Sequence, residues 1–117
     1  MRKAFTLHTC KTCQRIFDDL NPEGNGCVVV NIKEQGIGAK DLDAMKVHAG
    51  SYESLFSRRA MKFRSMGLAE KKLSESDYRT LILGEYTFLK RPVFLFNDAV
   101  TAGSRKSEVE RARELLR

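Results

Sequence analysis

Two cysteines near the amino end, Cys10 and Cys13, lie where an apolar run meets a helical pattern. Residues 4–7 predict a strand, and Ile16 and Leu20 recur one turn apart, as in an amphipathic helix. The free N–H groups and the positive dipole end at a helix amino terminus stabilise an anion. This placement therefore predicts a thiol with a lowered pKa, in a pair that can close into a disulfide.

A Cys-x-x-Cys near a β-α-β pattern is typical of a thioredoxin-like redox motif, and the alternatives are half of a zinc site or two cysteines with no special role. A tetrahedral zinc site needs about four ligands. Outside the pair, the chain offers only Cys27, His8 and His48. We therefore expect a redox pair and no metal centre. Cys27 is interpreted as a small buried hydrophobe.

The composition suits one globular domain, since 42% of the 117 residues are hydrophobic and 31% are charged. No apolar run approaches the roughly 18 residues of a membrane span, and no signal peptide begins the chain. Three cysteines argue against a secreted disulfide scaffold, so we expect a cytoplasmic protein. The net charge of +6 suits oxyanions as well as nucleic acid. Because no nucleic-acid-binding module is visible, we expect neither a direct nucleic-acid partner nor a membrane partner.

The apolar runs predict four strands. Residues 27–32 are β-branched and almost entirely apolar, which predicts a strand covered on both faces. That strand completes a β-α-β unit with the first strand and helix. Residues 93–96 and 99–102 predict a hairpin, and a last helix opens near Ser107.

The stretch between the second and third strands is mainly helical, with Ser74 as the expected N-cap of one helix. This order of elements predicts an α/β, thioredoxin-like (glutaredoxin-like) three-layer fold. Its mixed four-stranded sheet carries a helical insertion between strands two and three. We expect a single domain over residues 1–117, with residues 1–32 and 87–117 as its core and residues 40–86 as the insert.

Three further features accompany the cysteine pair: the segment 55–68, the dipeptide Arg91-Pro92, and Arg105 followed by Ser107-Glu108-Val109. With these features, essentially the whole chain resembles the glutaredoxin-coupled arsenate reductase family and its Spx-like relatives. The resemblance implies that Cys10 is the nucleophile and that arginines hold the oxyanion and stabilise the thiolate. The matching arginines are Arg91, Arg105 and, in the insert, Arg58 or Arg59.

The proline of the Arg-Pro pair, Pro92, matches the place where thioredoxin-like proteins hold a cis-proline beside the reactive cysteine. The resemblance implies no bound cofactor, and it implies that glutathione, glutaredoxin or thioredoxin supplies the electrons. The loop at residues 8–10 is shorter than in arsenate-reducing members. Those members commonly lack a second cysteine at the place of Cys13, whereas Spx-like members have one.

Three functions follow. In the first, a thiol-dependent oxidoreductase of the arsenate reductase type, Cys10 attacks an oxyanion or a disulfide and Cys13 resolves the adduct. In the second, a dithiol reductase acts on protein or glutathione mixed disulfides. In the third, an Spx-like regulator binds RNA polymerase and uses the pair as a redox switch.

Overall fold

The structure, a computed structural model, describes residues 2–117. The chain divides into two compact units. The core unit consists of Met1–Gly36 together with Arg91–Arg117, and the insert unit is Ile37–Lys90.

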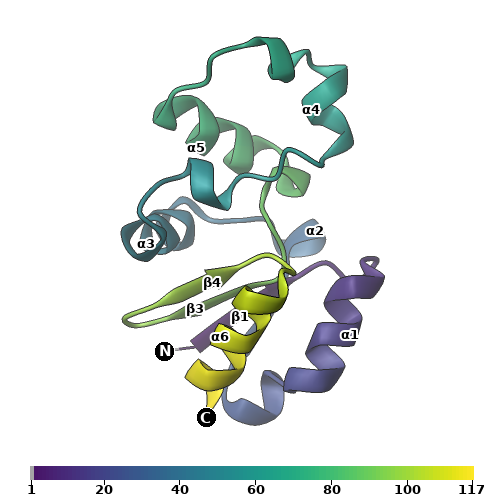
Figure 1. The fold of residues 1–117 in the computed structure, drawn as a ribbon, viewed down its shortest axis with the longest axis vertical. Coiled ribbons are helices and arrows are strands. Elements are labelled where there is room, and N and C mark those ends of the chain that lie inside the picture. Colours follow the sequence, from purple (N-terminus) through teal and green to yellow (C-terminus); the bar gives the residue numbers. More distant parts are fainter. Residues whose placement is uncertain (1) are drawn as a thin grey trace. The chain divides into compact units, whose positions relative to one another are not determined.

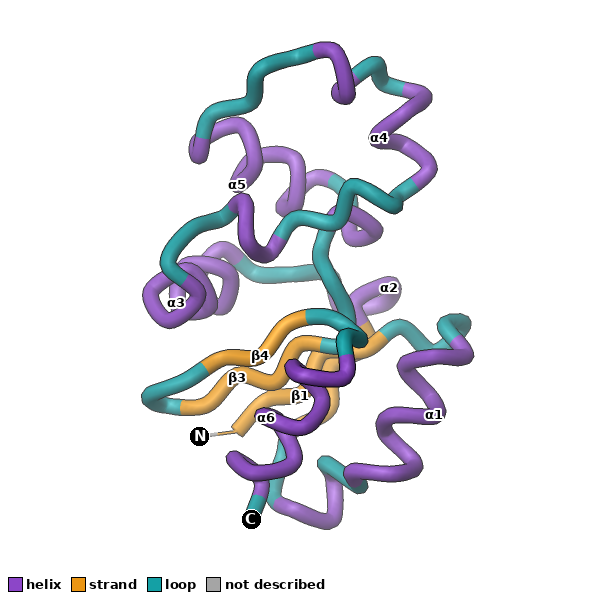
Figure 2. The backbone as a smooth tube through the Cα atoms, in the orientation of Figure 1, coloured by secondary structure: helices purple, strands orange, loops and turns teal. Residues whose placement is uncertain are grey.

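A four-stranded mixed sheet forms the centre of the core unit (Figure 2). Its strands are β1 (Arg2–Thr6), β2 (Val28–Asn31), β3 (Val93–Phe96) and β4 (Val100–Ala102), in the order β2-β1-β3-β4. Strand β1 runs parallel to β2 and antiparallel to β3, and β3 pairs antiparallel with β4. The predicted mixed sheet of four strands is confirmed.

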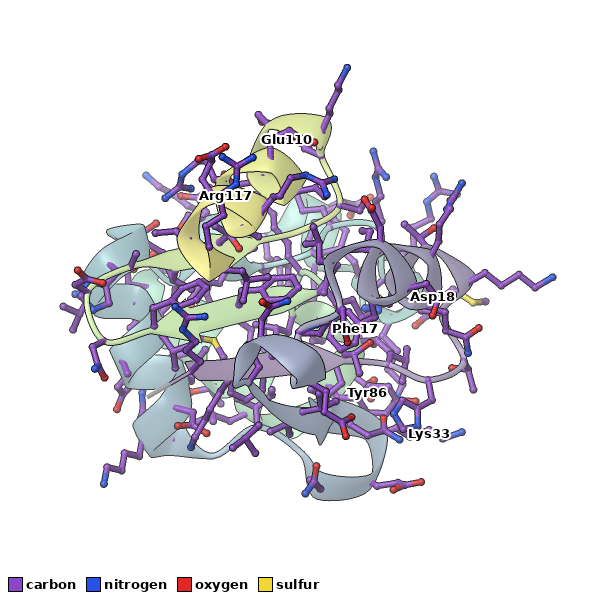
Figure 3. The ribbon with its side chains drawn as sticks, turned by 90° about the horizontal axis from the view of Figure 1, so that it is seen from below. Phe17, Asp18, Lys33, Tyr86, Glu110 and Arg117 are labelled. Atoms are coloured by element: carbon purple, nitrogen blue, oxygen red, sulfur yellow. The ribbon has the colours of Figure 1, made fainter. Side chains whose placement is uncertain are left out.

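Two helices, α1 (Lys11–Leu20) and α6 (Lys106–Leu116), cover the same face of this sheet (Figure 1). Phe17, labelled in Figure 3, packs from α1 onto Phe94 of β3, with ring centroids 5.6 Å apart. The buried cluster under the two helices consists of Ala4, Ile16, Leu20, Cys27, Phe94, Phe96, Ala112 and Leu116. Burial of this apolar area is the main stabilising contribution to the core unit.

Strand alternation places neighbouring side chains on opposite faces of the sheet. Ala4 and Phe94, which are paired across β1 and β3, both belong to the cluster under the helices. Phe5 and Leu95, one position along each strand, point to the other face and are also buried. The two central strands are therefore apolar on both faces.

The prediction for residues 27–32 is wrong in two respects. β2 lies at the edge of the sheet, where the helices over the central strands leave Val28 61% exposed. The strand also ends at Asn31, whose side chain accepts a hydrogen bond from the N–H of Lys33. This cap starts a short helix, α2 (Ile32–Gln35), so Ile32 is helical rather than extended.

The insert unit is helical, as the sequence predicted. Phe56 forms the centre of its core, stacked on Phe88 at 4.9 Å and in edge contact with Tyr78 at 4.9 Å. Its α-helices are α3 (Ala39–Ala49), α4 (Met61–Ser65) and α5 (Glu75–Gly84), and its 3₁₀ turns are η2 (Glu53–Leu55), η3 (Leu68–Glu70) and η4 (Tyr86–Phe88). A fourth 3₁₀ turn, η1 (Glu23–Asn25), belongs to the core unit.

The predicted N-cap of α5 is confirmed. Ser74 and Asp77 form a reciprocal capping box, in which each side chain accepts a hydrogen bond from the backbone N–H of the other residue. A second polar contact connects α3 to α5, where Arg79 makes two hydrogen bonds to Asp43, at 2.8 and 3.1 Å. Within residues 2–117, no helix has both the length and the apolar character needed to cross a membrane.

Candidate functional site

Cys10 is the N-cap residue of α1, directly after the loop that follows β1. Its backbone N–H donates to the carbonyl of Leu7 at 2.9 Å, which closes a tight turn at the end of the strand. The first turn of α1 contains no acidic side chain. Cys10 as a residue is partly exposed, whereas Cys13 is buried.

Several groups around Cys10 favour its thiolate. Burial raises the pKa of Cys10, but the N–H and thiol of Cys13, the positive charge of Arg91 and the N–H of Thr12 together lower it below the ordinary value. The amides belong to the first turn of α1, whose donors have no partner within the helix. These are the two kinds of group, a helix amino terminus and an arginine, that the sequence analysis expects beside Cys10.

Cys13 has the opposite environment. It is fully buried in the first turn of α1. Burial, the hydrogen bond with Cys10 and the negative charge of Cys10 raise the pKa of Cys13 to about 11, although the Leu7 N–H and the Thr6 hydroxyl act in the other direction. The two thiols are free and in hydrogen-bond contact. Cys10 therefore ionises more readily than an ordinary cysteine, and Cys13 ionises less readily.

Arg91 and Pro92 come directly before β3. The peptide bond between them is cis. The antiparallel register of β1 and β3 pairs Phe5 with Val93, so its continuation brings Pro92 opposite Thr6, at the end of β1. The Nε atom of Arg91 is buried. The structure thus brings Arg91, more than 70 residues away in sequence, to the thiol pair.

The other predicted arginines are placed differently. Arg105 is the N-cap residue of α6, and its side chain is exposed. Arg58, in the insert unit, pairs with Glu53 at 2.8 Å and donates to the Tyr78 hydroxyl at 3.0 Å. Arg59 is exposed. The roles of Arg58, Arg59 and Arg105 at an oxyanion stay predictions.

A polar group at the strand ends was missed from the sequence. The Asn31 side chain, at the end of β2, makes a hydrogen bond with Nδ1 of His8 at 3.2 Å. The side chain of Gln14 donates to the backbone carbonyl of His8. Both contacts hold His8, two positions before Cys10. The sequence signal for this group is a polar residue, Asn31, at the end of an apolar strand. Because β1 and β2 are parallel and their register pairs Thr6 with Asn31, such a residue lies next to the end of β1.

Cys27 lies outside this group. It is 6% exposed and belongs to the apolar cluster under α1 and α6, as expected for a small hydrophobe. Burial raises the pKa of its thiol. Among residues 2–117, no three His, Cys, Asp or Glu side chains gather in a way that could hold a metal ion.

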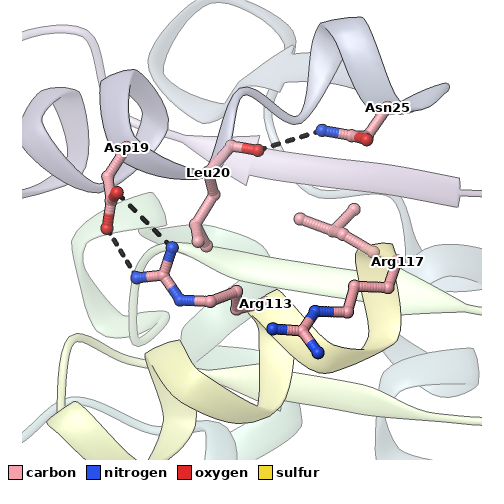
Figure 4. Close-up of a pocket in the computed structure, with 6 residues that line it drawn as sticks. Asp19, Leu20, Asn25, Arg113 and Arg117 are labelled. Carbon is pink, nitrogen blue, oxygen red and sulfur yellow. Dashed lines mark hydrogen bonds and ion pairs between the residues drawn. The ribbon is translucent and has the colours of Figure 1, made fainter.

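A small pocket of about 150 Å³ lies at the opposite end of α1 (Figure 4). Asp19 and Arg113 close one side of it through a 2.7 Å ion pair. Arg117 and Asn25 line it as well, and Asn25 donates to the Leu20 carbonyl at 3.1 Å. Because nearly the whole length of α1 separates this pocket from Cys10, it is no part of the thiol site.

A mixed sheet in the order β2-β1-β3-β4, with a Cys-x-x-Cys pair where the central strand β1 passes into α1, is the arrangement of a thioredoxin-like fold. The chain belongs to the ArsC family, whose model matches residues 5–112. The predicted thioredoxin-like fold and the resemblance to this family are both confirmed.

Known relatives agree with this assignment. An uncharacterized protein of Bacillus subtilis, YusI, is 27% identical over 104 residues, which cover 86% of this chain and 88% of YusI. A putative arsenate reductase from Yersinia pestis has a TM-score of 0.79 at 12% identity, over 97% of this chain and 99% of that chain. An arsenate reductase from Vibrio cholerae has a TM-score of 0.78 at 13% identity, over 94% and 95%. At such identities the two structures show a shared fold.

Proposed function

We propose that the protein is a thiol-dependent oxidoreductase in which Cys10 is the nucleophile and Cys13 the resolving cysteine. The observation that carries this proposal is the placement of the two thiols, Cys10 partly exposed at the amino end of α1 and Cys13 buried in its first turn. This placement lowers the pKa of Cys10 and raises that of Cys13 to about 11. Because the thiolate is the reactive form, the pair has a built-in order of reaction. The accessible sulfur reacts first and the buried sulfur second.

With a disulfide substrate, the Cys10 thiolate attacks one sulfur and expels the other as a thiolate, leaving a mixed disulfide on Cys10. Cys13 then loses its proton to solvent and attacks the Cys10 sulfur, which releases the second half of the substrate. Two electrons leave the protein, and a Cys10–Cys13 disulfide remains. Glutathione, glutaredoxin or thioredoxin returns the two electrons and restores the dithiol.

The pair controls the timing of the second step. While Cys10 is a thiolate, its charge and its hydrogen bond raise the pKa of Cys13. A mixed disulfide on Cys10 carries no charge, so both effects disappear when the first step is complete. The pKa of Cys13 then falls, and the resolving thiolate forms when there is an adduct to resolve.

With an oxyanion substrate such as arsenate, the same thiolate attacks arsenic and displaces a hydroxide, which leaves as water after protonation. Attack by Cys13 on the adduct reduces arsenic(V) to arsenic(III) and again leaves the internal disulfide. The Arg91 guanidinium, already in electrostatic contact with Cys10, provides planar charged donors for such an oxyanion. The name of the Vibrio cholerae neighbour favours this substrate.

The test is a coupled turnover assay with glutathione and glutaredoxin, run first with arsenate and then with a glutathione mixed disulfide. We expect turnover in the wild type and no turnover in Cys10→Ser. Cys13→Ser should accumulate a covalent adduct on Cys10, which mass spectrometry detects. Cys27→Ala is the matched control, because it removes a cysteine from the apolar cluster, and it should retain turnover.

The two substrates separate the alternatives. Arsenate turnover supports the arsenate reductase type, and turnover of the mixed disulfide alone supports a dithiol reductase. Inactivity of the folded dithiol protein with both substrates, or full activity of Cys10→Ser, rules out the proposed enzyme. If the folded dithiol protein is inactive with both substrates, binding of purified RNA polymerase by the reduced but not the oxidised protein would identify a redox-switched regulator.

A further inference from the structure

The positive charge of the chain is concentrated in one short segment of the insert unit. Residues 58–72, which we name the basic segment, carry six Lys or Arg side chains and one acidic residue, Glu70. Their net charge is +5, whereas the whole chain has a formal net charge of +6. The other 102 residues are therefore almost neutral, so a long-range attraction for anionic partners originates in the basic segment.

Two of these six cations are used within the insert unit. Arg58 pairs with Glu53 at 2.8 Å, and Lys62 pairs with Glu85 at 2.7 Å. Within the described residues, the remaining cations form no ion pair. They are Arg59, Arg64, Lys71 and Lys72, and all four are exposed. Their charges are available to a partner.

Apolar side chains in the basic segment divide into an inner and an outer set. Phe63 packs edge-on against Phe56 at 5.9 Å, and Leu68 is 5% exposed, so these two residues attach the segment to the insert core. Met61, in contrast, is 88% exposed and Met66 is 48% exposed. The segment thus exposes two apolar side chains together with its unpaired cations.

We propose that the basic segment is a docking surface for an acidic protein partner, with Arg59 and Arg64 as charge contacts and Met61 and Met66 as apolar contacts. Arginine and methionine are both enriched in protein–protein interfaces, and methionine adapts its shape to a partner. A surface that binds single-stranded nucleic acid instead needs exposed aromatic rings on which bases stack. The one aromatic residue of the basic segment, Phe63, is only partly exposed and packs edge-on against Phe56.

The test uses a fluorescein-labelled amphipathic helical peptide of glutamate and leucine as the probe, with anisotropy as the measurement. We expect binding by the wild type that weakens at least about tenfold when ionic strength rises from about 50 to about 300 mM. Arg59→Glu/Arg64→Glu should weaken binding by at least about tenfold. Met61→Ser/Met66→Ser should weaken binding several-fold at constant charge.

Lys33→Glu/Lys40→Glu is the matched control, since it makes the same change in net charge at two exposed lysines outside the segment. It should retain most of the affinity, and circular dichroism should show that all variants are folded. An equal loss in this control would overturn the proposal, as would unchanged affinity in the methionine variant. No binding by the wild type, or tighter binding of a single-stranded oligothymidylate than of the peptide, would also overturn it.

Discussion

Between Cys10 and Cys13, which are three positions apart, the structure creates two different thiols. Cys10 is the N-cap residue of α1, is partly exposed and feels the positive charge of Arg91, whereas Cys13 is fully buried. Desolvation opposes charge on both sulfurs, but only Cys10 has enough donors and positive charge to overcome it. The difference in reactivity therefore comes from position within a single helical turn.

Removal of the charge at Arg91 should raise the pKa of Cys10. In Arg91→Ala, the pH midpoint of Cys10 alkylation by iodoacetamide should move upward, and the rate at pH 7 should fall several-fold because less thiolate is present. Arg91→Lys keeps a cation and should retain most of the wild-type profile. Superimposable pH profiles for wild type and Arg91→Ala would remove Arg91 from the thiol site.

The Asn31–His8 hydrogen bond should contribute measurably to the loop that precedes Cys10. Asn31→Ala should cost about 1 kcal/mol in the free energy of unfolding, because it also removes the cap on the Lys33 N–H. A double-mutant cycle with His8→Ala, measured by urea denaturation, should give a coupling of about 0.5 kcal/mol. Strict additivity of the two substitutions would mean that the 3.2 Å contact adds nothing.

At the scale of elements, caps and periodicity predicted most of the fold. Ser74 was identified as an N-cap, and helices α1, α3, α5 and α6 follow their apolar spacing. The apolar run of β2 predicts a strand covered on both faces, but β2 lies at the edge of the sheet. An apolar run indicates a preference for burial and carries no information about strand order, which decides the edge. The turns of the insert unit depend on packing around Phe56. No local sequence pattern predicts this packing.

The residues of the candidate site also fall into two groups, those that local sequence predicts and those that depend on strand pairing. Cys10 and Cys13 are recognisable from local spacing, because a strand-to-helix junction is encoded within about ten residues. Thr6 and Asn31 depend on the pairing of two strands, and Arg91 depends on a third strand from the far end of the chain. The resemblance to a family, and not periodicity, was what pointed to Arg91.

The capping box of α5 should stabilise the insert unit in a pH-dependent way. Ser74→Ala should lower the free energy of unfolding by about 1 kcal/mol at pH 7, measured by urea denaturation. The N–H and the hydroxyl of Ser74 hold the pKa of Asp77 below its usual value. The stabilisation by the ionised Asp77 carboxylate is therefore fully present above about pH 4, which is the carboxyl pKa of an unfolded chain. It is lost as the pH falls through the lower pKa of Asp77 in the folded state.

The difference in the free energy of unfolding between wild type and Ser74→Ala should therefore become smaller in acid. Ser104→Ala is the control, since this exposed serine is not an N-cap, and it should change the stability by less than about 0.5 kcal/mol. A Ser74→Ala effect as small as that of Ser104→Ala would contradict the assigned role of the box.

At the scale of the whole molecule, the buried thiol should make the reduced protein sensitive to alkali. The pKa of Cys13 is raised to about 11 in the folded state, whereas an unfolded cysteine has a pKa of about 8.5. The unfolded chain therefore ionises first, and stability present below about pH 8.5 is lost progressively as pH rises towards 11. Cys13→Ala should lack this component when unfolding is measured against pH.

The difference between wild type and Cys13→Ala is the informative quantity, because lysines and tyrosines titrate in the same range and largely cancel between the two proteins. Cys27→Ala reports separately on the other buried thiol, whose pKa is also raised. If wild type and Cys13→Ala lose stability in parallel between about pH 8.5 and 11, the raised pKa assigned to the buried Cys13 thiol is wrong.

The order of strands in the sheet has a consequence for biosynthesis. β1 is made first, yet its partner β3 ends only at Phe96, after the entire insert unit has been made. A chain emerging from the ribosome thus displays Cys10 and Cys13 long before Arg91 exists to act on them. Until β3 has been translated and has paired with β1, the charge of Arg91 cannot act on Cys10, so this part of the lowering of the Cys10 pKa arises only after the insert unit has been made.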